Sequence, residues 1–132
     1  MKITVKRLKP EFVDYRGAIT RIINEPKVKI KAVLIITQKK GTIRGNHYHK
    51  KDYHWVYCAS GKFRYYEKNM KKKSNKVTSV ILKSGDLVLS KPHVAHAMKA
   101  LEDTVFWAIT TERRQQSSYE ADTVRLDIVN KK

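Results

Sequence analysis

The hydrophobic pattern of this chain consists of short runs, and none of them has the spacing of a long amphipathic helix. Most runs alternate apolar and polar residues, and this period of two places successive side chains on opposite faces of a strand. Turn-forming residues separate the runs, so the pattern predicts a series of short strands. The predicted strands are Lys2–Leu8, Gly17–Ile23, Lys29–Thr37, Arg44–His49, His54–Ala59, Lys62–Lys68, Lys76–Lys83, Asp86–Ser90, Ala95–Ala100, Val105–Thr111 and Val124–Val129.

Many short strands between turn signals are typical of an all-β sandwich or barrel. The chain has no internal repeat and no linker, and 132 residues suffice for one hydrophobic core. We therefore predict a single domain over residues 1–132. The lysine-rich segment Lys68–Lys76 is expected to be an exposed hairpin tip, because burying it would carry a large desolvation cost. The polar segment Gln115–Asp122 is expected to be a loop or one short helical turn.

Lysine and arginine number 29 against 12 acidic residues, which gives a formal net charge of +17. A positive field of this strength attracts phosphorylated small molecules or nucleic acid. Solvated lysines on outward strand faces are the simplest interpretation, and a phosphorylated ligand is the next. Nucleic acid is the least favoured partner, because it would need aromatic and basic residues interleaved on one face. The one such stretch, Lys62–Tyr66, fits a barrel strand.

The sequence has no apolar run of about 18 residues or more, so we expect no membrane span. The N-terminal stretch Met1–Pro10 has neither an apolar segment nor a small-residue cleavage site, so we expect no secretory signal. The single Cys58 excludes an internal disulfide and fits a reducing compartment. These features together predict a soluble, cytoplasmic protein.

Four of the five histidines have the spacing of metal ligands. His47 and His49 lie two apart in a predicted strand, so their side chains share a face. The segment Lys50–Tyr53 is predicted to be a tight hairpin connection that returns His54 to that face. His96 follows a second turn-bounded segment. Three or four imidazoles that meet at one point suit a catalytic metal and leave one or two coordination positions open.

We therefore predict a divalent metal site made of His47, His49, His54 and His96. Zinc is the first expectation, and nickel, iron, manganese and copper are the alternatives. The competing interpretation is structural, because a single histidine on a strand is usually a hydrogen-bonded or surface residue. His93 lies three residues before His96 in a predicted turn, and we expect it at the surface or behind the ligands.

The two histidine segments resemble the two motifs of the cupin superfamily. The first motif is Gly, five residues, His-x-His, three or four residues, Glu, six residues, Gly. This chain keeps that spacing with a histidine in the glutamate position, and it matches the second motif more loosely. The matching residues are Gly41, His47, His49, His54 and Gly61 in the first motif, and Gly85, Pro92 and His96 in the second. The resemblance implies an all-β, cupin-type double-stranded β-helix (a jelly-roll barrel), commonly as a homodimer.

Narrower similarities lead to three groups that act on nucleotide-linked 4-keto sugars. Phe12–Gly17 and Arg44–His47 are similar to dTDP-4-dehydrorhamnose 3,5-epimerases. Arg44–Lys51, Cys58–Gly61 and Pro92–Met98 are similar to sugar-nucleotide 3,4-ketoisomerases, and Gly45–His49 is similar to the zinc cupin domain of capsular sugar reductases. The resemblance implies that Arg16 and Arg44 contact the nucleotide diphosphate, and Lys62 is a further candidate for that contact.

The three groups use the same histidines differently. In the epimerases the histidine that corresponds to His47 removes the proton next to the ketone. In the ketoisomerases the histidines that correspond to His47 and His49 act as acid and base without metal. In the zinc group the same positions hold the ion. The four-residue gap before His54 matches the metal-binding spacing, which favours metal. Tyr65, Tyr66 and Tyr119 are candidates for a partner acid by residue type only.

The favoured function is that of a nucleotide-sugar isomerase or epimerase in polysaccharide sugar biosynthesis, with the histidines or a bound metal promoting enolisation. One alternative is a metal-dependent cupin of another reaction class, such as a dioxygenase or a sugar-phosphate isomerase. Another is a non-catalytic module that binds a sugar or a nucleotide. Trp55 and Tyr57 are predicted to face outward and to need cover, which a second subunit of a homodimer could supply.

Overall fold

The computed structural model describes residues 3–25, 27–72, 76–113 and 115–130, which form antiparallel strands and one short helix. The elements in chain order are β1 (Val5–Arg7), β2 (Phe12–Asp14), β3 (Gly17–Ile19), β4 (Ala32–Gln38), β5 (Ile43–His49), β6 (His54–Ser60), β7 (Lys62–Asn69), β8 (Thr78–Lys83), β9 (Asp86–Ser90), β10 (Val94–Ala100), β11 (Thr104–Thr110), α1 (Gln116–Asp122) and β12 (Thr123–Arg125). Within the described residues, no helix has the length and apolarity needed to cross a bilayer.

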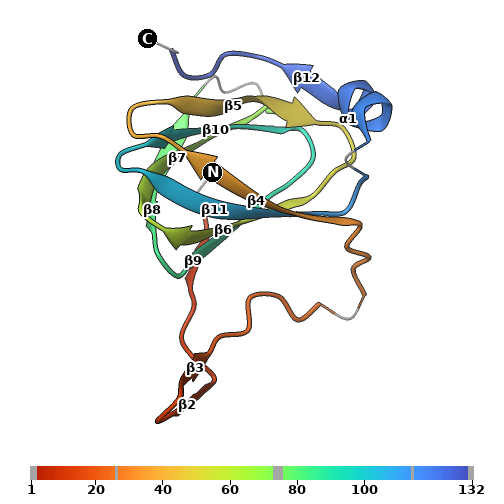
Figure 1. Cartoon of the computed structure of the whole chain (residues 1–132). Helices are drawn as coiled ribbons and strands as arrows, with labels where there is room; N and C mark the ends of the chain where they lie inside the picture. Colours follow the sequence, from red (N-terminus) through yellow and green to blue (C-terminus); the bar gives the residue numbers. More distant parts are fainter. Residues whose placement is uncertain (1–2, 26, 73–75, 114, 131–132) are drawn as a thin grey trace.

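Two five-stranded sheets face each other and enclose the core (Figure 1). The first has the order β1-β9-β6-β11-β4, and the second has the order β12-β5-β10-β7-β8. From β4 to β7 the chain changes sheet at every connection, and it does so again from β8 to β11. This alternation between facing antiparallel sheets produces a jelly roll. The prediction of an all-β, cupin-type barrel is therefore confirmed.

The connection from β5 to β6 differs from the predicted hairpin. The two strands belong to opposite sheets, so residues 50–53 cross the end of the barrel. His54 nevertheless faces the same interior as His49, because both inner sheet faces line one cavity. The predicted meeting of these side chains is correct, although the predicted strand pairing that explained it is wrong.

Other differences occur at the ends of the chain. Strand β2 lies in a stretch for which no strand was predicted, and it pairs with β3 to form a separate hairpin. The predicted strand Gly17–Ile23 ends at Ile19, and the predicted strand Val124–Val129 ends at Arg125. After Arg125, a side chain replaces strand pairing: the Asn46 amide oxygen accepts hydrogen bonds from the backbone N–H groups of Ile128 and Val129. The predicted tip Lys68–Lys76 has exposed lysines at 71 and 72, and residues 73–75 lie outside the described residues.

Apolar side chains from both sheets fill one part of the barrel interior. Phe63 and Phe106 are fully buried, and their ring centroids lie 5.3 Å apart. Val56, Cys58 and Leu82 complete the packing around them. Burial raises the pKa of the Cys58 thiol to about 11, with further contributions from Asp86 and Glu102, so the thiol stays protonated at neutral pH.

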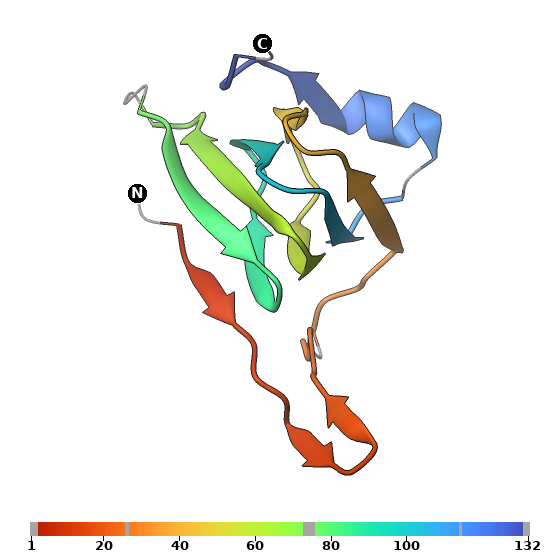
Figure 2. The same ribbon diagram turned by 60° about the vertical axis from the view of Figure 1, so that its left-hand side comes forward.

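Trp55 faces outward as predicted, but this chain provides its cover. It is 8% exposed and belongs to a second apolar cluster on the outer face of the first sheet. Ile22, Ile23 and Val28, from the segment between β3 and β4, pack against that cluster. Trp55 therefore needs cover as expected, and its own chain supplies it instead of a second subunit. The β2–β3 hairpin at the other end of this segment projects from the barrel on the side away from α1 (Figures 1 and 2).

Candidate functional site

Four histidines from three strands meet at one end of the barrel interior. The ring centroid of His47 lies 4.8 Å from those of both His49 and His96. The centroid of His54 lies 4.4 Å from that of His49 and 5.7 Å from that of His96. His49, His54 and His96 are at most 6% exposed. The structure thus brings together all four residues that the sequence identified as metal-ligand candidates.

A bulge in β5 sets the orientation of this strand. Gly45 and Asn46 both have positive φ, and the pairing of β5 with β10 shifts at this point. An added Cβ on Gly45 would lie 2.8 Å from the backbone oxygen of His96, so only glycine fits this close approach. His47 is paired with His96, and Arg44 is paired with the inward-facing Met98. Arg44 and His47 therefore leave the same face of β5 although they are three residues apart.

His96 is the most deeply buried of the four histidines, at 1% exposure. Its Nδ1 lies 2.8 Å from the buried Ser90 Oγ, which fixes the orientation of the ring. When Nδ1–H donates this hydrogen bond, Nε2 keeps the lone pair that a metal or a proton requires. Burial and the neighbouring histidines lower the pKa of His96 well below its usual value. His96 is therefore neutral at physiological pH.

His54 has a carboxylate partner. Its Nε2 lies 2.5 Å from Asp52 Oδ2, and both side chains are buried. Asp52 Oδ1 also accepts hydrogen bonds from the backbone N–H groups of Thr111 and Glu112. Burial alone would raise the pKa of the Asp52 carboxyl, but the hydrogen bonds from His54 and Thr111 and the nearby histidines together lower it. Asp52 is therefore an anion that orients His54.

The donor atoms form two overlapping groups. One nitrogen each from His47, His49 and His96 lie within 4.8 Å of one another, and so do one atom each from His49, Asp52 and His54. Both groups share His49, so the predicted set of four histidines is divided into a three-histidine group and a mixed group. Three imidazoles, of which His49 and the neutral His96 are buried, form a donor set that suits zinc and related divalent ions. The residues present therefore fit a metal.

The C-terminal segment covers the histidines from the side of the second sheet. The Tyr119 ring on α1 lies 5.8 Å from that of His49 and 6.4 Å from that of His47, measured between centroids. Thr123 Oγ1 lies 3.3 Å from His49 Nδ1, and Asp122 Oδ2 lies 3.5 Å from it. These contacts on Nδ1 turn His49 Nε2 toward the other imidazoles. The predicted polar segment is thus a helix that carries site residues.

A tyrosine–glutamate pair lies behind His96. The Tyr65 ring is stacked on that of His96 at a centroid distance of 6.4 Å, and its hydroxyl donates a 2.8 Å hydrogen bond to Glu67 Oε2. Burial raises the pKa of both groups, and the charge of Glu67 raises that of Tyr65 further. Tyr66 alternates with these residues along β7 and leaves the other face of the strand. Of the three tyrosine candidates, Tyr119 alone has ring contacts with both His47 and His49.

The predicted substrate-binding residues lie in three different places. Arg44 is exposed on β5, three residues before His47, and its Nη2 donates a 3.1 Å hydrogen bond to the Thr37 carbonyl oxygen. Arg16 lies on the projecting β2–β3 hairpin, where it pairs with Asp14. Lys62 lies at the start of β7, at the opposite end of that strand from Glu67, and its Nζ is 3.7 Å from Glu102. His93 occupies a turn with φ of 62°, and its ring lies beside that of Tyr48, outside the histidine group.

Several site residues were missed in the sequence. Asp52 lies two residues before His54, and this short spacing could have indicated a carboxylate partner. Glu67 follows Phe63 and Tyr65 in strict alternation, so its inward orientation was readable from the strand pattern. Ser90 and Asp122 had no such signal, because strand pairing and helix docking bring them to the histidines from distant parts of the chain.

No protein-family pattern matches the chain, and no curated protein matches it in sequence. Solved structures do resemble it. The 3,4-ketoisomerase QdtA of Thermoanaerobacterium thermosaccharolyticum, a mutant solved with TDP-4-keto-6-deoxyglucose, has a TM-score of 0.74 and 22% identity, over 93% of this chain and 86% of that one. The dTDP-4-dehydrorhamnose 3,5-epimerase of Sulfolobus tokodaii has a TM-score of 0.75 and 17% identity, over 93% and 84%.

A third structure, CapF bound to an inhibitor, has a TM-score of 0.65 and 23% identity. The match covers 92% of this chain but 35% of CapF, so this chain corresponds to one part of CapF. These structural neighbours fall into the three groups that the sequence motifs resemble. They establish a shared cupin-type fold at low sequence identity.

Proposed function

We propose that this protein is a metal-binding cupin that moves a proton beside the ketone of a nucleotide-linked keto sugar. The observation that carries the proposal is the group of four imidazoles, which are buried except for part of His47, together with the exposed Arg44 three residues before His47 on β5. An imidazole suits proton removal from a carbon acid, because its pKa lies near neutrality. Structural neighbours solved with TDP or with TDP-4-keto-6-deoxyglucose support the same class of substrate.

His47 is the proposed base. It is the least buried of the four histidines, and Arg44 leaves the same face of β5. A substrate whose diphosphate contacts Arg44 would therefore present its sugar to His47. Tyr119 is the proposed acid on the other side of the sugar, because its ring lies next to those of His47 and His49.

His49 and His96 would hold the metal, with His54 and Asp52 adjoining His49, because a His47 imidazole whose lone pair bound the ion could not also act as the base. A bound divalent ion would polarise the ketone and so stabilise the enolate that forms when the proton leaves. Ser90 would keep His96 Nε2 directed at the site, and Asp122 and Thr123 would do the same for His49.

We propose a homodimer as the working form. Exposed apolar residues occur on the β2–β3 hairpin and on the outer face of the edge strand β4, where Val33 is 62% and Ile35 is 70% exposed. A second copy could bury both surfaces. The hairpin carries Arg16 away from the histidines of its own chain (Figure 1), so Arg16 would serve the site of the second copy. Changing Val33 and Ile35 to serine should then yield monomers in analytical ultracentrifugation.

One observation favours a second candidate function. His49, Asp52 and His54 form a set of two histidines and one carboxylate, which is the ligand type of non-haem iron oxygenases. Asp52 argues against this reading, because both of its carboxylate oxygens already accept hydrogen bonds from the protein. Metal analysis of protein purified without a chelator or a His-tag, combined with an oxygen-uptake assay, separates the two functions.

Deuterium exchange tests the main proposal. TDP-4-keto-6-deoxyglucose is incubated in D₂O with the zinc-loaded protein, and proton NMR follows the hydrogens on the two carbons beside the ketone. Exchange at one or both carbons, lost in His47→Ala and kept in His93→Asn, is the expected result. Binding of TDP without any exchange would instead identify a non-catalytic nucleotide-binding module.

A further inference from the structure

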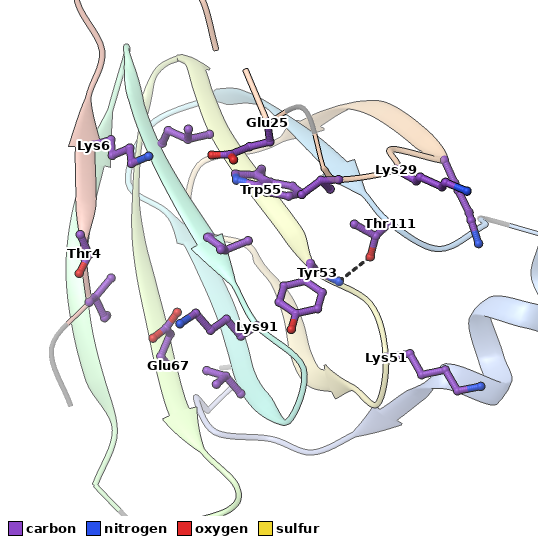
Figure 3. A pocket seen from close by; sticks show the side chains of 16 residues that line it. Thr4, Lys6, Glu25, Lys29, Lys51, Tyr53, Trp55, Glu67, Lys91 and Thr111 are labelled. Carbon is purple, nitrogen blue, oxygen red and sulfur yellow. Dashed lines mark hydrogen bonds between the residues drawn. The ribbon is translucent and has the colours of Figure 1, made fainter. Parts of the chain in front are cut away.

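A cavity of about 800 Å³ lies against the outer face of the first sheet and extends to Glu67 of β7, and no histidine lines it. Trp55 on β6 and Leu87 and Leu89 on β9 form its floor, and Val28 and Glu25, from the segment between β3 and β4, border it. Figure 3 shows Trp55 and Tyr53 in the middle of this space. The volume is in the range of about 300–1,000 Å³ that is usual for small-molecule sites.

The alternation of side chains at the start of β6 turns the histidine of this stretch away from the cavity. His54 faces the barrel interior, whereas its neighbours Tyr53 and Trp55 line the outer cavity. The backbone of Tyr53 is held in place, because its N–H donates a 3.0 Å hydrogen bond to Thr111 Oγ1. Trp55 on β6 and Tyr53 directly before this strand are thus the two chain neighbours of a candidate metal ligand.

The rim of the cavity is strongly basic. Five lysines line it against two acids, Glu25 and Glu67. Lys31 pairs with Glu112, and Lys91 lies close enough to Glu67 to lower the pKa of that carboxyl against the effect of burial. The other three lysines form no salt bridge with any residue in the described part of the chain, and they are Lys6, Lys29 and Lys51.

We propose that this outer cavity is a second binding site, for a small phosphomonoester with a flat apolar body. The apolar body would lie against Tyr53, which is 43% exposed, and against the small part of Trp55 that its own chain leaves uncovered. The phosphate would lie between Lys29 and Lys51, which are on the same side of Tyr53 as Thr111 (Figure 3). Lysine ammonium groups without an acidic partner bind phosphate oxygens through charge-assisted hydrogen bonds.

The shape of the surface favours this class of ligand over a macromolecule. A concave space bordered by a strap of the same chain encloses one small molecule, whereas nucleic acid would need an extended basic face. The overall charge of +17 attracts any anion, but it does not place an apolar floor beside unpaired lysines. We therefore expect both the phosphate and the apolar body of the ligand to contribute to binding.

Isothermal titration with 1-naphthyl phosphate tests the proposal, at a salt concentration that screens the diffuse field. Saturable binding to one site per chain is expected, at least about tenfold tighter than that of 1-naphthol or inorganic phosphate, since charged hydrogen bonds contribute this much. The double variant Lys29→Ala/Lys51→Ala should weaken binding about tenfold or more. The matched control Lys71→Ala/Lys72→Ala removes the same charge from the exposed end of β7 and should leave binding unchanged.

Three results would overturn the proposal. Absence of saturable binding would show that the cavity is not a site. Equal weakening in both double variants would show attraction by net charge alone. Loss of binding in His47→Ala, or full displacement by TDP, would place the probe among the histidines. None of these results depends on turnover, so the proposed enzymatic function can fail or hold independently.

Discussion

The two halves of the barrel interior are built from the same strands but have opposite chemistry. On β10, inward-facing His96 is followed two residues later by Met98, and on β6 inward-facing His54 is followed by Val56. Buried apolar side chains fill one half, whereas the other contains imidazoles, Asp52 and Glu67. A step of two residues along a strand thus separates the core from the site, and the barrel holds polar groups rigidly because its other half is tightly packed.

The largest expected effect belongs to the polar half. Replacing His47 with alanine should lower turnover by about 10²–10⁴-fold, because the proposed base is lost. The melting temperature should change little, since His47 is only partly buried. The deuterium-exchange rate and a thermal melt measure the two effects together. The control His93→Asn keeps a residue type that tolerates the positive φ at this turn and should retain full activity. Wild-type turnover in His47→Ala would remove this residue from the mechanism.

The apolar half should respond in stability. Phe106 is fully buried against Phe63, so Phe106→Ala should lower the free energy of unfolding by about 3–5 kcal/mol through lost burial and a cavity. Chemical denaturation measures this loss. The control Val77→Ala, at a 38% exposed position just before β8, should cost about 0.5 kcal/mol or less. A similar cost at both positions would mean that the two halves of the barrel do not differ as described.

The boundary between the halves can be tested at Ser90. Ser90→Ala removes the partner of His96 Nδ1, and zinc affinity should fall about 10–100-fold while the fold is kept. A competition titration with a zinc-binding dye measures the affinity. Ser84→Ala, at an exposed hydroxyl outside the site, is the matched control. If Ser90→Ala binds zinc as tightly as the control does, His96 is not held for metal binding by Ser90.

The smallest expected effect is a pH dependence of stability in metal-free protein. The pKa of His96 is lowered in the folded state. Below about pH 6.5 the His96 imidazole is therefore protonated in the unfolded chain but stays neutral in the folded chain. Stability should therefore fall as the pH drops below this value, with a slope of at most about 1.4 kcal/mol per pH unit from this group. Denaturation with a chelator present, between pH 7.5 and about pH 5, measures the slope. An unchanged slope in His96→Asn would assign the effect to other groups.

Much of the fold could be predicted from the sequence, because alternation and turn residues are local properties. The strands from Ala32 to Thr110 match the predicted runs to within a few residues. Prediction failed where structure depends on a distant partner. Strand β2 forms because β3 pairs with it. The C-terminal strand ends at Arg125, and beyond it the backbone N–H of Ile128 donates a hydrogen bond to the Asn46 side chain instead of to a neighbouring strand.

The candidate site divides in the same way. The spacing of His47 and His49 determined that two imidazoles would share a face, since side-chain direction has a fixed period of two along a strand, whereas His54 joins them from the opposite sheet. Only the tertiary structure decided how the donors are grouped, which carboxylate orients His54, and that a C-terminal helix covers the ligands. Those outcomes depend on which strands lie side by side, and pairing between distant segments leaves no periodic signal in the sequence.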